Sequence, residues 1–152
     1  MSVIMDIADA LADALNDEGN DFSMEFAAAR AYQALLELPE MKDLHVTVVP
    51  KGVALAPADR SRVQHDVQVD IAVQKKLGPA TDDEEEYDEQ AELDGLMGLV
   101  EEIADFLKFR RLGSQPTAAW VKTENDPIYS QDHLERLRQF TSVLTVTYRV
   151  VR

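Results

Sequence analysis

The sequence predicts an α+β domain in which a mainly antiparallel β-sheet is flanked by an N-terminal helix and one long amphipathic helix. Apolar and polar residues alternate from Val63 to Leu77, which is typical of a strand with one buried face. A similar alternation closes the chain between about Gln139 and Val151. Between these two strands an apolar stripe at helical spacing runs from about Tyr87 to Arg111.

Length and composition indicate a single domain over residues 1–152. The chain has 152 residues, of which 45% are hydrophobic, and it contains no cysteine. It has no apolar run of bilayer length, so we expect no membrane association. The acidic start of the chain lacks the basic region of a secretory signal, and the absence of cysteine fits a reducing cytoplasm.

The net charge of −14 is concentrated in one segment. Residues 82–94 hold nine acids and no base, which leaves 20 acids and 15 bases, or −5, for the rest of the chain. A protein that grips phosphate backbones needs clustered Lys and Arg, so this composition argues against nucleic-acid binding.

The N-terminal part predicts one helix and one ambiguous segment. Apolar residues at helical spacing predict a helix from about Ser2 to Leu15, which a breaker cluster at residues 16–20 ends. The segment from Phe22 to Leu38 contains strong helix formers but also fits a period of two, so helix and strand both stay open.

A hairpin with a wide loop is predicted next. Leu44 to Val49 is a short β-branched strand that Pro50 and Gly52 end. Residues 51–62 then form an exposed, flexible connection into the long strand that begins at Val63.

The second half of the chain alternates helix and strand. Residues 78–87 predict a flexible linker, and acids crowd the start of the long helix in a way that suits the helix dipole. We expect a strand over Ala119–Glu124 and a short helical turn over Gln131–Leu137. The apolar stripe of the long helix consists of Leu93, Leu96, Met97, Val100, Ile103, Ala104 and Leu107.

No arrangement of residues predicts catalysis, a cofactor or a specific metal site. The acid run lacks the glycine and the ordered alternation of a calcium loop, so at most weak Mg²⁺ association is expected. His45, His65 and His133 are scattered without metal-ligand spacing. We therefore expect a protein that is not an enzyme.

The candidate interface residues are all charged. Four bases bracket the long strand and would suit ion pairs with the acids of a neighbouring subunit, although ordinary solvated surface explains them as well. The candidate subunit or partner interface consists of Arg60, Arg62, Lys75, Lys76, Asp82, Asp83, Glu84, Glu85 and Glu86.

The order of these elements resembles the tail terminator (tail-completion) proteins, minor tail proteins of long-tailed bacteriophages and prophages. The resemblance covers nearly the whole chain. It rests on the segments 44–50, 61–63 and 73–76, on the helix segment 96–103, and on the closing segment 139–148.

The resemblance implies a structural virion protein that forms a six-fold ring, a homohexamer. Such a ring caps the head-proximal end of the tail tube, stops its polymerisation and offers a surface for head–tail joining. The implied partners are the tail tube protein and the head connector or neck proteins, while DNA passes through the lumen without specific binding. The protein would be assembled in the host bacterial cytoplasm. The resemblance also favours strand over helix for Phe22 to Leu38.

Two other functions stay open on the sequence. A neck or head-completion protein would have a similar size and topology and would bind the head connector instead of the tube. An acidic inhibitor of a nucleic-acid-binding enzyme would be a monomer that presents its acids on a rigid face. A metal-dependent hydrolase is the weakest alternative, because no ordered ligand set is evident.

Overall fold

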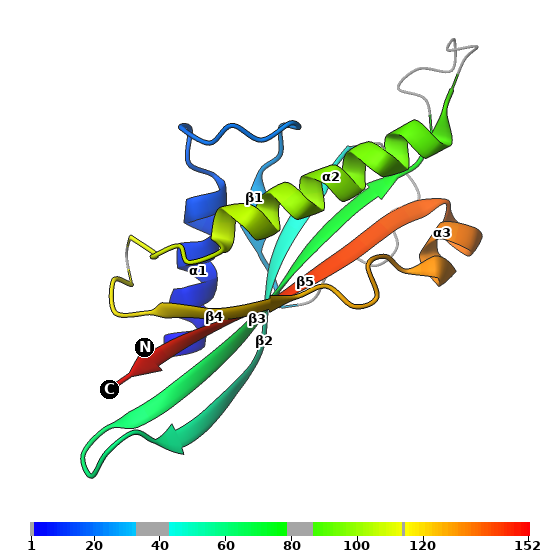
Figure 1. The fold of residues 1–152 in the computed structure, drawn as a ribbon. Helices are drawn as coiled ribbons and strands as arrows, with labels where there is room; N and C mark the ends of the chain where they lie inside the picture. Colours follow the sequence, from blue (N-terminus) through cyan, green and yellow to red (C-terminus); the bar gives the residue numbers. More distant parts are fainter. Residues whose placement is uncertain (1, 33–42, 79–86, 114) are drawn as a thin grey trace.

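The computed structural model describes residues 2–32, 43–78, 87–113 and 115–152, and within them it forms one five-stranded sheet with three helices (Figure 1). The strand order is β1-β2-β3-β5-β4, and every pairing except β1 with β2 is antiparallel. The predicted α+β class is therefore confirmed. The acid run at residues 82–86 lies outside the described residues. The elements are α1 (Val3–Leu15), β1 (Ala28–Arg30), β2 (His45–Pro57), β3 (Val63–Lys76), α2 (Glu89–Leu107), β4 (Ala119–Glu124), α3 (Gln131–Leu137) and β5 (Gln139–Val151).

The central pair, β3 and β5, carries the core. The two strands pair from Gln64 opposite Val151 to Lys76 opposite Gln139 without a register shift. Their apolar side chains point to the same side, where Val69, Ile71, Leu144 and Tyr148 are buried. The predicted alternation is therefore confirmed for both strands, since their apolar side chains face the core.

Helices α1 and α2 cover that apolar face. Ile7 and Leu11 of α1 and Leu99 and Ile103 of α2 are fully buried in one hydrophobic cluster with the strands. The hydroxyl of Ser2 accepts a hydrogen bond from the backbone N–H of Met5 and so caps α1 at its predicted start. The carboxylate of Asp88 caps α2 in the same way through Ala91.

Helix α2 ends four residues earlier than the sequence predicts. Lys108 leaves the helix with extended backbone angles, and Phe109 has a left-handed φ of 59°. The Arg110 side chain donates a hydrogen bond to the carbonyl of Phe106, and the Arg110 backbone N–H donates to the carbonyl of Leu107, so carbonyls at the helix end are satisfied within this turn. A helix that ran to Arg111 would have Lys108, Arg110 and Arg111 in its last turn, and in the structure these three bases follow the helix instead.

The ambiguous segment from Phe22 to Leu38 is a strand only at β1, and its residues 33–38 lie outside the described part of the chain. Residues 21–27 form an irregular loop whose Phe22 ring packs on Phe26 and on Phe106 of α2. Residues 21–27 form neither a strand nor a helix. Their backbone instead follows an irregular path that places the Phe22 ring against Phe26 and Phe106.

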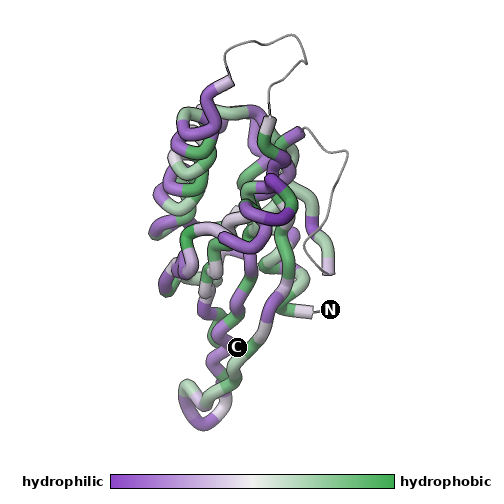
Figure 2. Tube along the Cα trace, turned by 90° about the vertical axis from the view of Figure 1, so that its right-hand side faces the viewer, coloured by the Kyte–Doolittle hydropathy of each residue, from purple (hydrophilic) through white to green (hydrophobic). Residues whose placement is uncertain are grey.

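The prediction of a loop over residues 51–62 is wrong for most of that range. Strand β2 continues to Pro57, and only Ala58 to Arg62 form the turn. Pro50 and Gly52 do not end the strand; the register shifts between them, which is where a residue without a backbone N–H is tolerated. Figure 2 shows the resulting hairpin projecting clear of the rest of the molecule. Its distal part, residues 51–66, is called the arm below.

The predictions for the last three elements are confirmed, whereas most of the predicted linker at residues 78–87 lies outside the described residues. Strand β4, the short helix α3 and the closing strand β5 have the predicted bounds. His133 of α3 hydrogen-bonds Thr141, which faces the side of the sheet opposite to α1 and α2. Among the described residues no helix is both long and apolar enough to cross a membrane.

We expect a core leucine and an arm leucine to differ sharply in their contribution to stability. Leu144→Ala should lower the free energy of unfolding by about 2–5 kcal/mol, because it leaves a cavity in a fully packed face. Leu55→Ala, on the exposed arm, should change it by no more than about 0.5 kcal/mol. Urea denaturation followed by circular dichroism measures both, and equal losses would show that the arm folds back onto the body.

Candidate assembly interface

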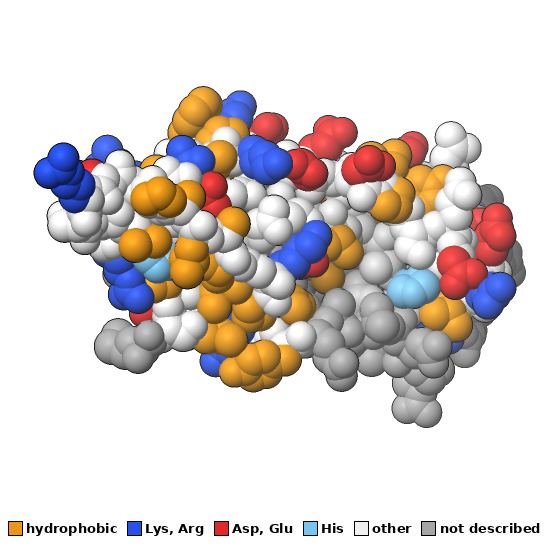
Figure 3. All heavy atoms as spheres, turned by 90° about the horizontal axis from the view of Figure 1, so that it is seen from below, with side chains coloured by type: hydrophobic (Ala, Val, Ile, Leu, Met, Phe, Trp, Pro, Cys, Tyr) orange, Lys and Arg blue, Asp and Glu red, His pale blue; other side chains and the backbone are white. Residues whose placement is uncertain are grey.

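The arm extends the apolar face of the sheet past the two helices. Val53, Leu55 and Val63 share the face of the buried Val67, yet they are exposed. They are three of the seven large hydrophobic side chains that are exposed in the described part of the chain, and Leu55 is 65% exposed. Figure 3, seen from below where the arm projects, shows hydrophobic side chains gathered on this end with Lys and Arg among them. Such an uncovered strip is typical of a protein-interaction surface.

The tip of the arm is basic. Arg62 forms an ion pair with Asp59 within the turn, at 2.7 Å, and backbone N–H groups of Ser61 and Arg62 also donate to that carboxylate. These bonds hold the pKa of Asp59 below its usual value. Arg60 is exposed and has no ion-pair partner among the residues that the structure describes. Two of the predicted interface bases, Arg60 and Arg62, therefore lie together at the tip.

The other predicted interface residues lie elsewhere. Lys75 is half-buried under α2, where its ammonium lies 3.1 Å from the carboxylate of Glu92. Lys76 follows it at the end of β3, at the opposite end of the hairpin from the arm tip. Asp82, Asp83, Glu84, Glu85 and Glu86 lie outside the described residues. Lys75 and Lys76 are neighbours in β3 whose side chains point to opposite faces of the sheet, and neither lies near Arg60 and Arg62 at the other end of the hairpin. Contact of any of them with a neighbouring subunit stays a prediction.

The second face of the sheet is polar and its charges are balanced. The guanidinium of Arg149 makes two hydrogen bonds to the carboxylate of Asp66, at 2.8 and 3.2 Å, which lowers the pKa of Asp66. Lys122 lies 2.6 Å from Glu124, and Asp70 accepts a 2.6 Å hydrogen bond from Thr145. Thr147 is only 4% exposed, and its buried hydroxyl has no hydrogen-bond partner in the described structure. It lies in a shallow groove that also includes Lys122 and Arg149.

Two sheet edges are open. In the described ranges no strand pairs with the outer edge of β4 or with β2 beyond Pro50, because β1 ends opposite Val48. Unpaired N–H and C=O groups along such edges are a template for another strand. The two edges lie at opposite sides of the sheet, so one molecule presents two different surfaces.

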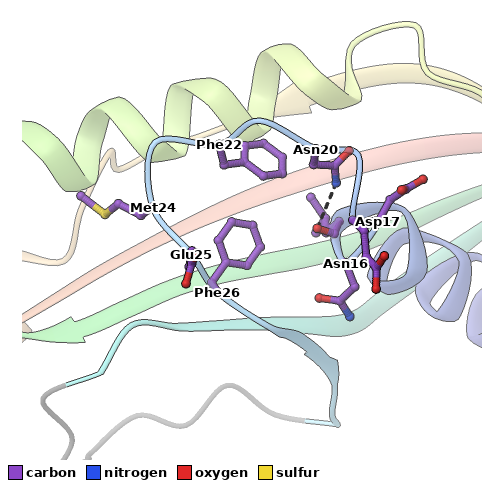
Figure 4. Close-up of a pocket in the computed structure, with 9 residues that line it drawn as sticks. Asn16, Asp17, Asn20, Phe22, Met24, Glu25 and Phe26 are labelled. Carbon is purple, nitrogen blue, oxygen red and sulfur yellow. Dashed lines mark hydrogen bonds between the residues drawn. The ribbon is translucent and has the colours of Figure 1, made fainter.

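An acidic hollow lies beside the C-terminal end of α1, between that helix and the loop that precedes β1. It has a volume of about 360 Å³ and an apolar floor that includes Phe22, Met24 and Phe26. Figure 4 shows the rings of Phe22 and Phe26 inside the curve of the loop and Asp17 next to the end of α1. From Asp13 to Ala29 the chain has five acids and no base, and Asp17, Glu18 and Glu25 line the hollow. The sequence analysis missed this site, because its residues carry no recognisable motif.

A basic turn of residues 108–111 follows α2. Phe109 is 78% exposed and stacks edge-on against Trp120, with ring centroids 4.9 Å apart. Arg110 lies over the ring of Phe106, and the buried hydroxyl of Tyr148 donates to the Arg110 carbonyl. A left-handed backbone costs a non-glycine residue about 1–2 kcal/mol. The fold therefore holds an aromatic side chain outward in a conformation that usually takes glycine.

The histidines that the sequence analysis singled out do not lie together with other metal-ligating side chains in the described part of the chain. No group of three His, Asp or Glu side chains among the described residues is placed to hold a metal ion. His65 is half-buried, with its Nδ1 3.2 Å from the Val63 carbonyl, and His133 hydrogen-bonds Thr141.

Comparison of the sequence with models of known protein families and with curated proteins gives no match.

The ion pair between Asp66 and Arg149 should contribute stability only above acidic pH. Because folding lowers the pKa of Asp66 from 3.8, the contribution is complete well above that value and disappears as pH falls through the lower folded value. Asp66→Asn should reduce the free energy of unfolding by about 0.2–1 kcal/mol at pH 7, a small effect because Arg149 is partly exposed to solvent. The difference should shrink below about pH 4. Urea melts across pH measure it, with exposed Asp21→Asn as control; a constant difference would contradict the assignment.

The left-handed backbone at Phe109 should reverse the usual order of stability, in which an alanine variant is more stable than a glycine variant. Phe109→Gly should be more stable than Phe109→Ala by about 1 kcal/mol, because both lose the Trp120 contact but only alanine keeps a Cβ at positive φ. At Glu101, exposed within α2, alanine should be the more stable by about 1 kcal/mol. Thermal unfolding of the four variants tests this, and the same order at both positions would contradict a left-handed Phe109.

Proposed function

We propose that the protein is a structural phage assembly protein that caps the head-proximal end of a tail tube as a ring of six copies. The observation that carries this proposal is the arm, which leaves an apolar sheet face and a strand edge uncovered at one side of the subunit. The resemblance of the element order to tail terminator proteins supplies the class of assembly.

The open edges suit a head-to-tail contact. The arm edge of one subunit would meet the β4 edge of the next, so each contact would use two different surfaces. Contacts of that kind generate rings when the rotation closes. The exposed Val53, Leu55 and Val63 would be buried against the neighbour, and main-chain hydrogen bonds would add strand to strand.

The polar face of the sheet suits the bore of such a ring. Its described carboxylates, Asp66, Asp70 and Glu124, each lie within ion-pair distance of a base. A face whose charges are paired in this way does not present the clustered free cations that grip phosphate. DNA would pass it without being held.

Two alternatives remain distinct in what they predict. A neck or head-completion protein would form a ring but would bind the head connector, so pull-down with purified tube protein separates the two. An acidic inhibitor would be a monomer with a rigid acidic face. An uncovered apolar arm would not help such a protein to bind a basic site, and neither would a polar face whose charges are paired.

Ring formation should depend on Leu55. Negative-stain electron microscopy of the concentrated wild type should show six-fold rings, and Leu55→Lys should abolish them, because it places a charge on the strip that the neighbour covers. The control is Ile128→Lys, which makes the same kind of change at an exposed position away from the arm and should leave the rings intact. Rings in the Leu55→Lys sample, or none in the wild type with or without Mg²⁺, would count against the proposal.

A further inference from the structure

The basic turn and the acidic hollow have complementary chemistry. The turn presents an exposed aromatic ring between cationic side chains, and the hollow presents a phenylalanine floor between carboxylates. Arg111 is exposed and has no ion-pair partner among the described residues. Lys108 has only a 3.9 Å contact with Asp105, so most of its charge is available to a partner.

The two features lie next to each other on one subunit. Phe106 of α2 joins them, because its ring contacts Phe22 of the hollow at 5.2 Å while Arg110 of the turn lies over it at 3.6 Å. The turn cannot enter the hollow of its own chain, since Tyr148 and Trp120 hold it pointing outward. A second copy related by two-fold rotation could meet both features at once, which is the geometry of a self-complementary interface.

We infer that the basic turn docks into the acidic hollow of a second copy of this chain, and that the contact is reciprocated around a two-fold axis. Phe109 would enter the hollow above Phe22 and Phe26, and Arg111 and Lys108 would meet Asp17, Glu18 and Glu25 at its rim. A volume of about 360 Å³ lies near the lower end of ordinary ligand pockets, which is room for one aromatic side chain rather than a chain segment.

The contact differs from the proposed ring in surface and symmetry. In Figure 1 the loop that borders the hollow lies at the upper side of the molecule and the turn follows the left-hand end of α2 at mid-height, whereas the arm projects from the lower side. The ring uses a head-to-tail contact of the arm, whereas the two-fold contact would pair subunits or whole rings face to face. A variant with a disabled arm therefore isolates the second contact.

Charge reversal tests the inference in the Leu55→Lys background. Sedimentation velocity should show a concentration-dependent dimer for this parent. Adding Arg111→Glu or Glu18→Lys should each weaken dimerisation at least roughly tenfold, because like charges would then face each other in both halves of the interface. An equal mixture of the two variants should dimerise again, since each half of the mixed interface then pairs opposite charges.

Matched controls and a second readout make the result decisive. Arg136→Glu and Glu135→Lys reverse exposed charges on α3 and should leave dimerisation unchanged. Trp120 is the only tryptophan, so its fluorescence should shift with dimer formation as the hollow covers Phe109. A monomeric parent, undiminished dimerisation of both single reversals, or a mixture that stays monomeric would each overturn the inference. None of these results bears on whether the wild type forms rings through the arm.

Discussion

The unequal lengths of the central strands and the helices determine most of this structure. At about 3.3 Å per residue, the 14 residues of β3 span roughly 46 Å. At 1.5 Å per residue, the 19-residue α2 spans only about 28 Å and the 13-residue α1 about 20 Å. Neither helix is as long as β3, and neither covers the distal end of the hairpin, where Val53, Leu55 and Val63 are exposed. The core forms where the helices reach, and the arm is the part that they do not.

The period-two pattern was sufficient to predict β3 and β5 because both strands place one face in a core, and burial enforces the alternation. Strand β2 was underestimated because Pro50 and Gly52 are local breakers, whereas the partner β3 continues to template the pairing beyond them. The hollow, the basic turn and the early end of α2 could not be predicted, since each depends on contacts between distant segments. Phe22 meets Phe106, and Phe109 meets Trp120, with nothing in either local sequence to indicate it.

The distribution of charge is more specific than the total of −14 suggests. On the polar face of the sheet Arg149 and Asp66 face each other across paired strands, so charges there largely cancel. Acids accumulate instead around the loop that follows α1, and bases accumulate at the end of α2 and at the arm tip. A net charge of one sign keeps copies apart at long range, and local patches of opposite sign select how they meet at short range.

Among the places in the described structure where local rules of stability are broken, two are prominent exposed surfaces. The arm leaves Leu55 and Val53 in water, and the basic turn holds Phe109 at a positive φ with its ring exposed. Neither feature helps the isolated chain to fold, because burial of the first and a glycine at the second would be more stable. In a sequence whose other elements are consistent with their burial, such exceptions are where function is expected. The proposed contacts between copies of the chain would cover both the arm and the basic turn.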